Sequence, residues 1–535
     1  MGSKRVLIIG GGIMQIPSIK AAKNMGWEVI VADRDVSVPG ADLADKIIQA
    51  DIADKNLVLE KAVEIHAKTP IDGVFTAGTD FSTTVAWIAD NLGLPGIPYA
   101  TALDASDKSR MRKVLKEAGL PVPEFVVFTG AEDIEALAGE MKFPVVVKPV
   151  DNMGSRGIKK VESLIDLKTT IRETMKYSRS SRLIIENFIE GAEFSIDAVI
   201  DGKKIHICGI AERHIMFEPY FIEMGHTIPC EPGKKILKEI SDSFKQGIIA
   251  LGINRGAAKG DIKYSPNGAV IVEIAARLSG GFMSGWTFPY SSGINPAAEA
   301  LKIAVGNEPG DFLPGKKMVS AERAFISIPG KIRNITGISE AGSLKNVKNL
   351  FIRVNTGDFV DLPLNNVEKC GNVIACAETR EKAVSAAESS IAKLRLFLEP
   401  GLSRTAIFLF GKKYPWFLDA FRLNREKNKI CYQNMAFYTK NIRKTGVKLE
   451  ILPIPDIESE SDRDWHGEDI VSAFDKVKLQ TSLNTRISGE IKIGKIFWQA
   501  FLRGGVQGGV WLIETLMKTE NIEEKLEEMK KLWIE

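Results

Sequence analysis

The sequence predicts a multidomain protein in which an α/β domain is followed by α+β domains. In residues 1–105, short apolar segments alternate with helical segments, which is the pattern of a doubly wound parallel sheet. Further along, apolar segments flank Pro266-Asn267-Gly268, which indicates an antiparallel hairpin. At about 150 residues per domain, a chain of 535 residues accommodates roughly three or four domains.

The α/β domain is expected over residues 1–105. Its apolar segments are short and end at glycine or aspartate, as buried parallel strands do, and Gly26 ends the first helix. The strands are predicted at residues 6–9, 27–32 and 73–76, and the helices at residues 17–25, 57–67 and 83–92.

An α+β domain is expected over residues 106–330, and a smaller one over residues 331–400. Pro121 and Pro123 end the first helix of the larger domain, because proline cannot continue a helix. The predicted strands are residues 143–149, 183–186, 193–200, 260–264 and 269–274, and the predicted helices are residues 107–119, 236–250 and 379–396.

Composition excludes several classes of protein. Hydrophobic residues make up 44% and charged residues 26%, which are ordinary values for a globular chain. The net charge of +3 gives no overall attraction to nucleic acid or to an acidic membrane. Five scattered cysteines do not form a disulfide framework. The amino terminus does not read as a signal peptide, and charged and amide residues interrupt the apolar segment 493–516, so we expect a cytoplasmic protein.

A glycine-rich turn near the amino terminus resembles part of a dinucleotide-binding fingerprint. Gly10-Gly11-Gly12 follows a strand and opens a helix, and Asp33 ends the next strand. Gln15 stands where the third glycine of that fingerprint belongs. The turn therefore has three readings: a nicotinamide site, a tight strand-to-helix reversal, or space for a small carboxylate at a helix start.

Two lysines and a glycine loop predict a phosphate site. Lys108 lies at a helix start, and Lys148 ends a buried strand. Lysines from separate elements can hold the α- and β-phosphates of a nucleotide as point charges. The loop 151–158 follows, and its glycines free the backbone to fold over a γ-phosphate. The donors expected in this loop are Gly154, Ser155, Arg156 and Gly157.

Four acids and an arginine complete the predicted site. Glu186 and Glu193 flank a short turn, where carboxylates can accept from an adenine amino group and ribose hydroxyls. Asp261 and Glu273 lie on the two strands of the hairpin, so both point to one place where Mg²⁺ fits between carboxylate and phosphate oxygens. Arg277 follows and can clamp a transferring phosphoryl group.

In this order, the residues resemble the ATP-grasp superfamily, especially its carboxylate–amine ligase and biotin-carboxylase-like branch. The resemblance covers roughly residues 4–400. It implies a Rossmann-like pre-ATP-grasp domain over 1–105, a two-lobed ATP-grasp domain over 106–330 and a small associated domain over 331–400. Residues 401–535 form an extension in which no family is recognised.

The resemblance also implies roles for individual residues. ATP and Mg²⁺, with Mn²⁺ as an alternative ion, are the expected cofactors, and Arg277 is expected to stabilise an acyl phosphate with Lys148. The implied ATP-binding residues are Lys108, Lys148, Glu186, Ile189 and Glu193, and the implied metal ligands are Asp261 and Glu273.

Two positions depart from the family pattern. Ala275 stands two residues after Glu273, where members usually carry asparagine, and Asp261 is shorter than the glutamate often found at its place. The loss of an oxygen ligand weakens the case for a second Mg²⁺. An ATP-binding regulatory protein without turnover therefore stands as an alternative to an enzyme.

The acceptor side of the site is expected near residues 221–229 and after Arg277. Glu223 or His226 can orient or deprotonate an amine, although both can equally be polar residues of a loop, as can Arg213 and His214 nearby. Ser279, in a stretch of small residues, allows close approach of a substrate carboxylate or simply makes a tight turn.

The extension carries two further patterns with open readings. Residues 464–469 contain one histidine and several acids, which suits either a metal site or a solvated loop. Residues 504–509 are rich in glycine, which suits a phosphate loop or a closely packed turn, but no Lys-Ser or Lys-Thr follows. Apolar residues at helical spacing end the chain, with Thr519 as the expected cap.

The expected activity is ATP-dependent ligation of a carboxylate to an amine or ammonia through an acyl phosphate, giving ADP and phosphate. A bicarbonate-using carboxylase or a carbamoyl-phosphate-like enzyme is the alternative reaction. The expected partners are small-molecule substrates and, by resemblance, a second copy of the chain; neither nucleic acid nor a membrane is expected.

Overall fold

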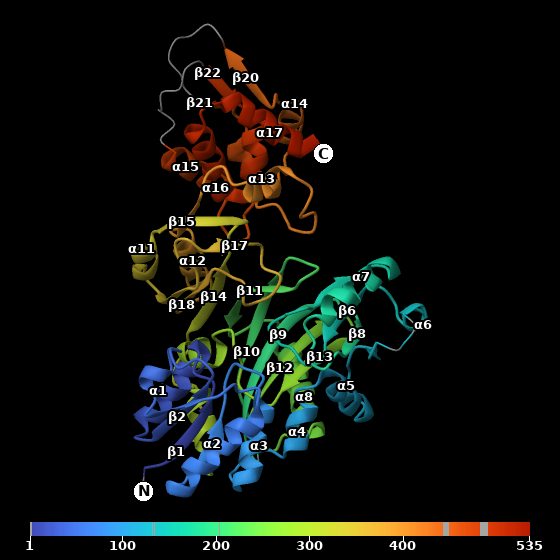
Figure 1. Ribbon diagram of the computed structural model, residues 1–535, viewed down its shortest axis with the longest axis vertical. Coiled ribbons are helices and arrows are strands. Elements are labelled where there is room, and N and C mark those ends of the chain that lie inside the picture. Colours follow the sequence, from blue (N-terminus) through green and yellow to red (C-terminus); the bar gives the residue numbers. More distant parts are fainter. Residues whose placement is uncertain are drawn as a thin grey trace. The chain divides into compact units, whose positions relative to one another are not determined.

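The computed structural model describes residues 3–130, 132, 134–202, 204–441, 449–481 and 490–534 (Figure 1). The chain divides into two compact units. The first unit comprises Met1–Glu322 with Cys376–Val384, and the second comprises Arg323–Ala375 with Ser385–Glu535. The predicted class, an α/β domain joined to α+β parts, is confirmed.

The amino-terminal part of the first unit is a parallel sheet with helices packed around it. Its elements are β1 (Arg5–Ile9), α1 (Ile16–Asn24), β2 (Glu28–Asp33), β3 (Lys46–Gln49), α2 (Lys55–Lys68), β4 (Gly73–Phe75), α3 (Ser82–Leu92) and α4 (Tyr99–Asp104). The strand order β3-β2-β1-β4 places the first strand in the middle. Val6 and Ile8 pack with α1 on one face, and Leu7 and Ile9 pack toward α2 and α3 on the other, as alternation along a strand requires.

A small antiparallel sheet follows in the same unit. Its elements are α5 (Lys108–Glu117), β5 (Phe125–Phe128), α6 (Ile134–Gly139), β6 (Val145–Pro149), β7 (Lys159–Val161), α7 (Leu164–Met175) and β8 (Leu183–Asn187). The strand order is β5-β8-β6-β7. Glu186 of β8 pairs with Val146 of β6, which brings its side chain into the neighbourhood of Lys148.

A larger antiparallel sheet completes the first unit. Its elements are β9 (Ala192–Asp201), β10 (Ile205–Met216), β11 (Ile222–Ile228), α8 (Lys234–Ala250), β12 (Arg255–Ser265), β13 (Gly268–Ala275), α9 (Phe288–Ser292), α10 (Pro296–Ala304) and β14 (Val319–Phe325). The strands run in the order β13-β12-β9-β10-β11-β14. Helix α8 covers one face, where Phe244 lies fully buried. The predicted hairpin is present, with Asp261 directly opposite Glu273.

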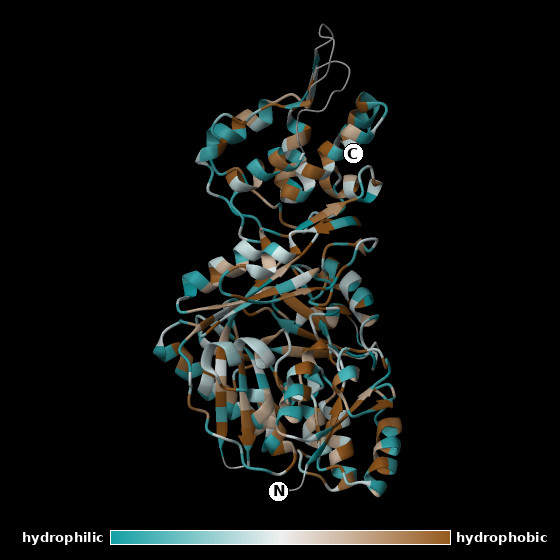
Figure 2. Ribbon diagram, turned by 90° about the vertical axis from the view of Figure 1, so that its left-hand side faces the viewer, coloured by the Kyte–Doolittle hydropathy of each residue, from teal (hydrophilic) through white to brown (hydrophobic). Residues whose placement is uncertain are grey.

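The second unit mixes small sheets with helices. Its elements are β15 (Gly330–Thr336), α11 (Ile338–Ser343), β16 (Val347–Ile352), β17 (Phe359–Val360), β18 (Gly371–Ala377), α12 (Arg380–Ile391), β19 (Arg395–Leu398), α13 (Ser403–Phe410), α14 (Glu426–Asn434), β20 (Tyr438–Asn441), β21 (Leu449–Ile451), α15 (Ile470–Gln480), β22 (Glu490–Ile493), α16 (Lys495–Lys518) and α17 (Ile522–Ile534). Aromatic rings of α15 and α16, including Phe474, Trp498 and Phe501, form much of its core. Hydrophobic residues lie along the strands, while many helices carry hydrophilic residues (Figure 2).

Three local expectations in the second unit are corrected. The helix predicted over 379–396 ends at Ile391, and the chain continues as strand β19 because residues 395–398 pair with β15. The glycines of 504–509 form neither a phosphate loop nor a simple turn but lie inside α16. The amide of Glu524 donates to Asn521, so Asn521 rather than Thr519 caps α17.

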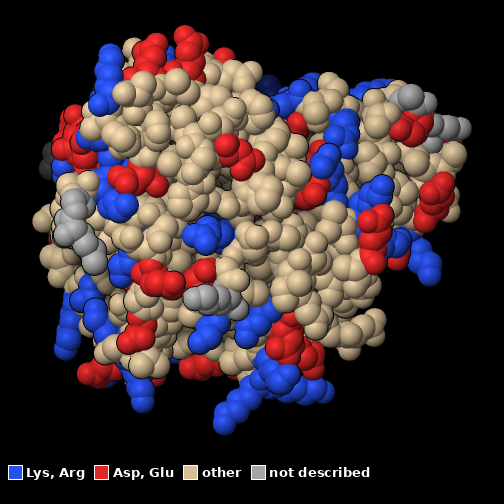
Figure 3. All heavy atoms as spheres, turned by 90° about the horizontal axis from the view of Figure 1, so that it is seen from below, with Lys and Arg blue, Asp and Glu red and all other residues tan. Residues whose placement is uncertain are grey.

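The charge on the surface and the polarity of the helices agree with the expectations from composition. On the face shown in Figure 3, basic and acidic side chains are interspersed among uncharged ones, in keeping with a net charge of +3. Among the helices that the structure describes, none has both the length and the apolar character needed to cross a membrane.

Helix α16 has a break that only glycine allows. Gly505 has φ 61° and ψ −151°, a region essentially restricted to glycine. A Cβ atom there would meet only ordinary neighbours, the nearest being Ala420 at 3.5 Å, so a substitution costs backbone strain rather than a clash.

We therefore expect Gly505→Ala to lower the free energy of unfolding by about 1–3 kcal/mol, measured by urea denaturation. Gly342→Ala in α11 is the matched control. Its Cβ meets only Leu350 at 4.0 Å, and alanine favours a helix, so the control should be neutral or slightly stabilising. Equal stability of the two variants would contradict the strained geometry at Gly505.

Candidate active site

A buried ion cluster joins α5 to the small antiparallel sheet. Glu186 is only 1% exposed, and its Oε2 accepts a hydrogen bond from Lys148 Nζ at 2.6 Å. Its Oε1 forms an ion pair with Arg112, whose Nε lies 2.6 Å away. Burial alone would raise the pKa of Glu186, but Arg112 and Lys148 outweigh it, so the pKa lies below its usual value. Both carboxylate oxygens are thus engaged within the protein, and Lys148 is held in place.

Lys108 links the glycine loop to the larger sheet. Asp107 caps α5 by accepting from the amides of Ser109 and Arg110, which sets Lys108 at the first position of the helix. Lys108 Nζ donates to the carbonyl of Asn152 at 2.7 Å and lies 3.3 Å from Oε1 of Glu273. A residue predicted to bind phosphate therefore reaches a residue predicted to bind metal.

The loop 151–158 takes a conformation that its glycines allow. Gly154 and Gly157 have φ of 67° and 70°, and Ser155 has φ 60°. The Ser155 hydroxyl donates to the carbonyl of Phe221 at 3.2 Å, which connects the loop to the start of β11. Arg156 is half-buried.

The two acids predicted to bind metal share a lysine. Lys259 Nζ lies 2.6 Å from Oδ2 of Asp261 and 3.2 Å from Oε2 of Glu273. Ser195 donates to the other oxygen of Asp261 at 2.6 Å. Burial raises the pKa of Glu273, but Lys108, Lys259 and other cations outweigh it, and the pKa falls well below its usual value. Glu273 is therefore ionised, and protein cations already lie beside both acids.

Arg213 of β10 joins three carboxylates. Its guanidinium pairs with Glu193, lies 2.9 Å from Oε2 of Glu223, and lies 3.2 Å from Oδ2 of Asp261. A continuous run of alternating charge thus extends from Lys108 through Glu273, Lys259, Asp261 and Arg213 to Glu193 and Glu223. It brings together the residues that the sequence placed in nucleotide, metal and acceptor roles.

Arg277 and Ser279 are anchored by acids from other elements. Arg277 donates from Nε and Nη2 to Oδ1 of Asp80, at 2.9 and 2.6 Å. The hydroxyl of Ser279 donates to Asp197, and its amide donates to the same carboxylate at 3.2 Å. Burial raises the pKa of Asp197 to about 6, against the opposing hydrogen bonds from Ser279.

The remaining predicted residues lie at the edges of this cluster or outside it. The carbonyl of Ile189 accepts from Lys263 Nζ at 2.9 Å. His226 is fully buried, with Nε2 2.8 Å from the hydroxyl of Thr287 and Nδ1 3.3 Å from Glu322. His226 therefore belongs to an internal polar network rather than to an exposed loop.

Four charged residues of the cluster received no site role from the sequence: Asp80, Arg112, Asp197 and Lys259. A usable signal exists for two of them. Arg112 lies four residues after Lys108, on the same side of a helix. Lys259 lies two residues before Asp261, on the same face of a strand. Asp80 and Asp197 come from a separate loop and strand, and no sequence spacing indicates them.

The amino-terminal glycine turn is held by hydrogen bonds and close packing with neighbouring residues of the chain. The amide of Gly11 donates to Oδ2 of Asp33 at 2.9 Å. A Cβ atom at Gly11 would lie 2.5 Å from a methyl group of Val38. Gln15 is buried and donates to the carbonyl of Ala77. Asp33, the acid of the partial fingerprint, therefore stabilises the turn itself, which favours the interpretation as a tight strand-to-helix reversal.

The donor set fits one divalent cation better than two. Asp261 and Glu273 present carboxylate oxygens to one place, as Mg²⁺ prefers. Ala275, next on the same strand face, has no oxygen in its side chain, and Lys259 occupies the space between the acids. Within the described ranges, three or more histidine, cysteine or acidic side chains do not gather as a metal site.

Comparisons with known proteins identify the class to which this architecture belongs. Family models match residues 19–96 as an ATP-grasp N-terminal domain, residues 141–285 as an ATP-grasp domain, and residues 324–399 as L-amino acid ligase C-terminal domain 2. The chain therefore carries domains of the ATP-grasp type, and the resemblance found in its sequence is confirmed.

Individual relatives agree with this class. The uncharacterized protein y4rH of Sinorhizobium fredii is 22% identical over 71% of this chain and 80% of its own. The L-amino acid ligase of Bacillus licheniformis has a TM-score of 0.65 at 20% identity, covering 75% of this chain and all of its own. The biotin carboxylase of Campylobacter jejuni has a TM-score of 0.58 at 20% identity, covering 74% and 92%. At these identities, the structural likeness establishes the fold.

The pKa of Asp197 predicts a measurable pH dependence of stability. An aspartate with a higher pKa in the folded protein than in the unfolded chain stabilises the fold while protonated, and the contribution is lost as pH rises through the folded value. A rise from 3.8 to about 6 corresponds to about 3 kcal/mol. We expect Asp197→Asn to gain about that much relative to the wild type between about pH 4 and pH 7, measured by urea denaturation without metal.

Ser279→Ala provides the second variant, because it removes a hydrogen bond that opposes the rise in the pKa of Asp197. Its loss of stability should begin at the same low pH and extend to higher pH than in the wild type. A difference between Asp197→Asn and the wild type that stays constant with pH would contradict the assignment.

Proposed function

We propose that this protein is an ATP-dependent ligase that joins a small-molecule carboxylate to an amine or ammonia and forms ADP and phosphate. One observation carries the proposal: in a chain with ATP-grasp domains, the charges of Lys108 and Arg277 act on Glu273, which lies opposite Asp261 on the hairpin. Cations there can hold the phosphates, and the acids can hold a divalent metal between them.

In the proposed reaction, the substrate carboxylate attacks the γ-phosphorus of ATP, ADP leaves, and the amine then displaces phosphate from the acyl phosphate. Lys148, fixed by Glu186, and Arg277, fixed by Asp80, neutralise charge on the transferred phosphoryl group. The glycine loop 151–158 closes over it and excludes water, which would otherwise hydrolyse the acyl phosphate. Mg²⁺ or Mn²⁺, when bound at Asp261 and Glu273, adds positive charge at the phosphate oxygens.

The same proposal assigns binding roles to the remaining residues. Lys108 and the loop residues Gly154, Ser155, Arg156 and Gly157 bind phosphates, and Glu186, Ile189 and Glu193 border the nucleoside. Glu223 and Ser279 border the acceptor substrates, and His226 supports Glu223 from the buried side, where its Nδ1 lies 3.9 Å from Oε1.

The proposed domain organisation has four segments. Residues 1–105 form the pre-ATP-grasp domain, residues 106–330 the ATP-grasp domain, residues 331–400 the small associated domain, and residues 401–535 an extension. A cytoplasmic location and a homodimer belong to the same proposal.

A second candidate is nucleotide binding without turnover. Lys259 and Ala275 favour it, because a lysine stands between the acids and a ligand is missing beside them. Use of bicarbonate as the substrate carboxylate is a variant of the first candidate, supported by the similar fold of a biotin carboxylase.

Phosphate release from MgATP tests the ligase. With pooled carboxylic acids and amino acids, we expect release that depends on one pool and falls at least about 100-fold in Lys148→Ala. Lys159→Ala, on the neighbouring strand and paired with Glu173 at 3.0 Å, is the matched control and should retain activity. Release with bicarbonate alone would select the carboxylase variant. ATP binding without release under any pool would select the second candidate.

Lys259 competes with a metal ion for the two acids. We therefore expect Lys259→Ala to bind Mn²⁺ at least about tenfold more tightly without nucleotide, measured by electron paramagnetic resonance. Lys263→Ala is the matched control, because Lys263 lies two residues beyond Asp261 on the same strand but donates to the carbonyl of Ile189. Unchanged Mn²⁺ affinity in Lys259→Ala would remove the acids from the proposed metal site.

A further inference from the structure

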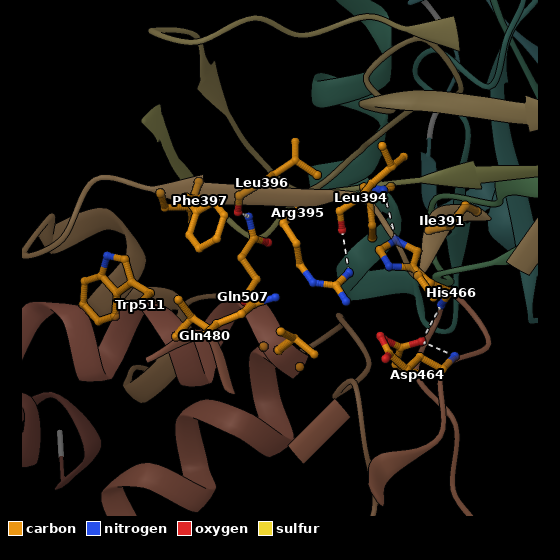
Figure 4. Close-up of a pocket in the computed structure, with 18 of the residues that line it drawn as sticks. Ile391, Leu394, Arg395, Leu396, Phe397, Asp464, His466, Gln480, Gln507 and Trp511 are labelled. Atoms are coloured by element: carbon orange, nitrogen blue, oxygen red, sulfur yellow. Dashed lines mark hydrogen bonds between the residues drawn. The ribbon is translucent and has the colours of Figure 1, made fainter. Parts of the chain in front are cut away.

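The second unit contains a cavity that the proposed ligase chemistry does not use. It lies between strand β19, the loop 464–468 and the broken helix α16 (Figure 4). Apolar side chains of Leu396, Val506 and Val510 line part of its wall. Trp511 also lines the cavity, and its indole nitrogen donates to the carbonyl of Glu399 at 2.9 Å.

Arg395 supplies an unsatisfied donor to this cavity. Its side chain extends from β19 toward α16, with Gln507 on one side and His466 and Asp464 on the other (Figure 4). Nη1 donates to the carbonyl of Leu394 at 2.7 Å. Nε is buried without a hydrogen-bond partner among the described residues. A buried guanidinium in this condition is stabilised by an acceptor that a ligand brings.

Asp464 supplies an acceptor to the same cavity. Its Oδ1 receives the amides of His466 and Glu468, each at 2.9 Å. In the described part of the chain, Oδ2 receives no hydrogen bond, and a Cβ atom at Gly505 would lie 3.9 Å from it. The break in α16 therefore leaves open space beside this oxygen. Burial raises the pKa of Asp464 to about 6, so a cation beside it would favour the ionised form.

Several other polar groups of the cavity already have partners. His466 Nε2 accepts from the amide of Ile326 at 3.1 Å, and burial lowers the pKa of His466 to about 4. Glu468 pairs with Lys476. Gln507 accepts from the amide of Ile328 at 3.0 Å. The histidine and acids of residues 464–469 thus belong to a folded loop. Their hydrogen-bond and ion-pair partners within the protein do not support the metal site considered for this segment.

We propose that this cavity binds a small zwitterion of the α-amino-acid class, with its carboxylate on Arg395, its ammonium on Asp464 and an apolar side chain against Val510. One unsatisfied donor cation and one free carboxylate oxygen match the two charges of such a molecule. A nucleotide or other polyanion fits poorly, because Asp464 and Glu468 lie beside the single arginine. This binding is separate from the ATP-grasp cluster and stands whether or not that cluster catalyses ligation.

Calorimetric titration of the full chain with L-leucine and with L-leucyl-L-leucine tests this proposal. We expect saturable binding of at least one of them, weakened at least about tenfold in both Arg395→Gln and Asp464→Asn. L-leucinamide, which lacks the carboxylate, and 4-methylpentanoic acid, which lacks the ammonium, should bind at least about tenfold more weakly. Arg404→Gln, which removes an exposed arginine of α13 paired with Asp361, is the matched control.

Photo-leucine crosslinking gives a readout that does not depend on the variants folding. The label should map to residues 391–398 or 504–514 of the wild-type chain. Labelling confined to residues 193–281 would place the amino acid in the ATP-grasp cluster and overturn the proposal. Absence of binding by both probes, or binding that Arg395→Gln and Asp464→Asn leave unchanged when folded, would also overturn it.

Discussion

The first unit depends on mutual neutralisation of charges that are largely removed from water. Glu186 is the clearest case, because a fully buried carboxylate is stable only with strong partners, and it has two in Arg112 and Lys148. Removing either partner would leave an uncompensated charge. The same constraint governs the run from Lys108 to Glu223, in which each carboxylate contacts at least one cation.

This constraint explains why the site is assembled from so many elements. Arg112 comes from α5, Lys148 from β6, Glu186 from β8, Arg213 from β10 and Lys259 from β12. A single strand or helix cannot present opposite charges on all sides of one carboxylate, whereas paired strands and a capped helix can. Under the proposed function, substrate phosphates and a metal ion would enter an environment that is already organised, and little reorganisation would remain for the reaction.

The second unit is held together by aromatic packing rather than by paired buried charges. Aromatic rings on α15 and α16 form much of its core, and the backbone of α16 leaves helical φ/ψ at Gly505. The break there costs the helix regular hydrogen bonding but opens space beside Asp464 and Arg395. A glycine-rich segment that resembles a phosphate loop in sequence is therefore used to interrupt a helix and to shape a cavity.

The sequence by itself determined the fold class, the resemblance to the superfamily and the order of the residues proposed to bind phosphate and metal. These depend on local patterns: apolar periodicity, a capped helix start and a hairpin that sets Asp261 against Glu273. It also indicated that Gln15 argues against a nicotinamide site. Only the tertiary structure decided which cations neutralise which acids, because Arg213, Asp80 and Asp197 reach the cluster across strand pairings distant in sequence. Likewise, the end of α12 at Ile391 and the break at Gly505 were set by packing, which local helix propensity does not contain.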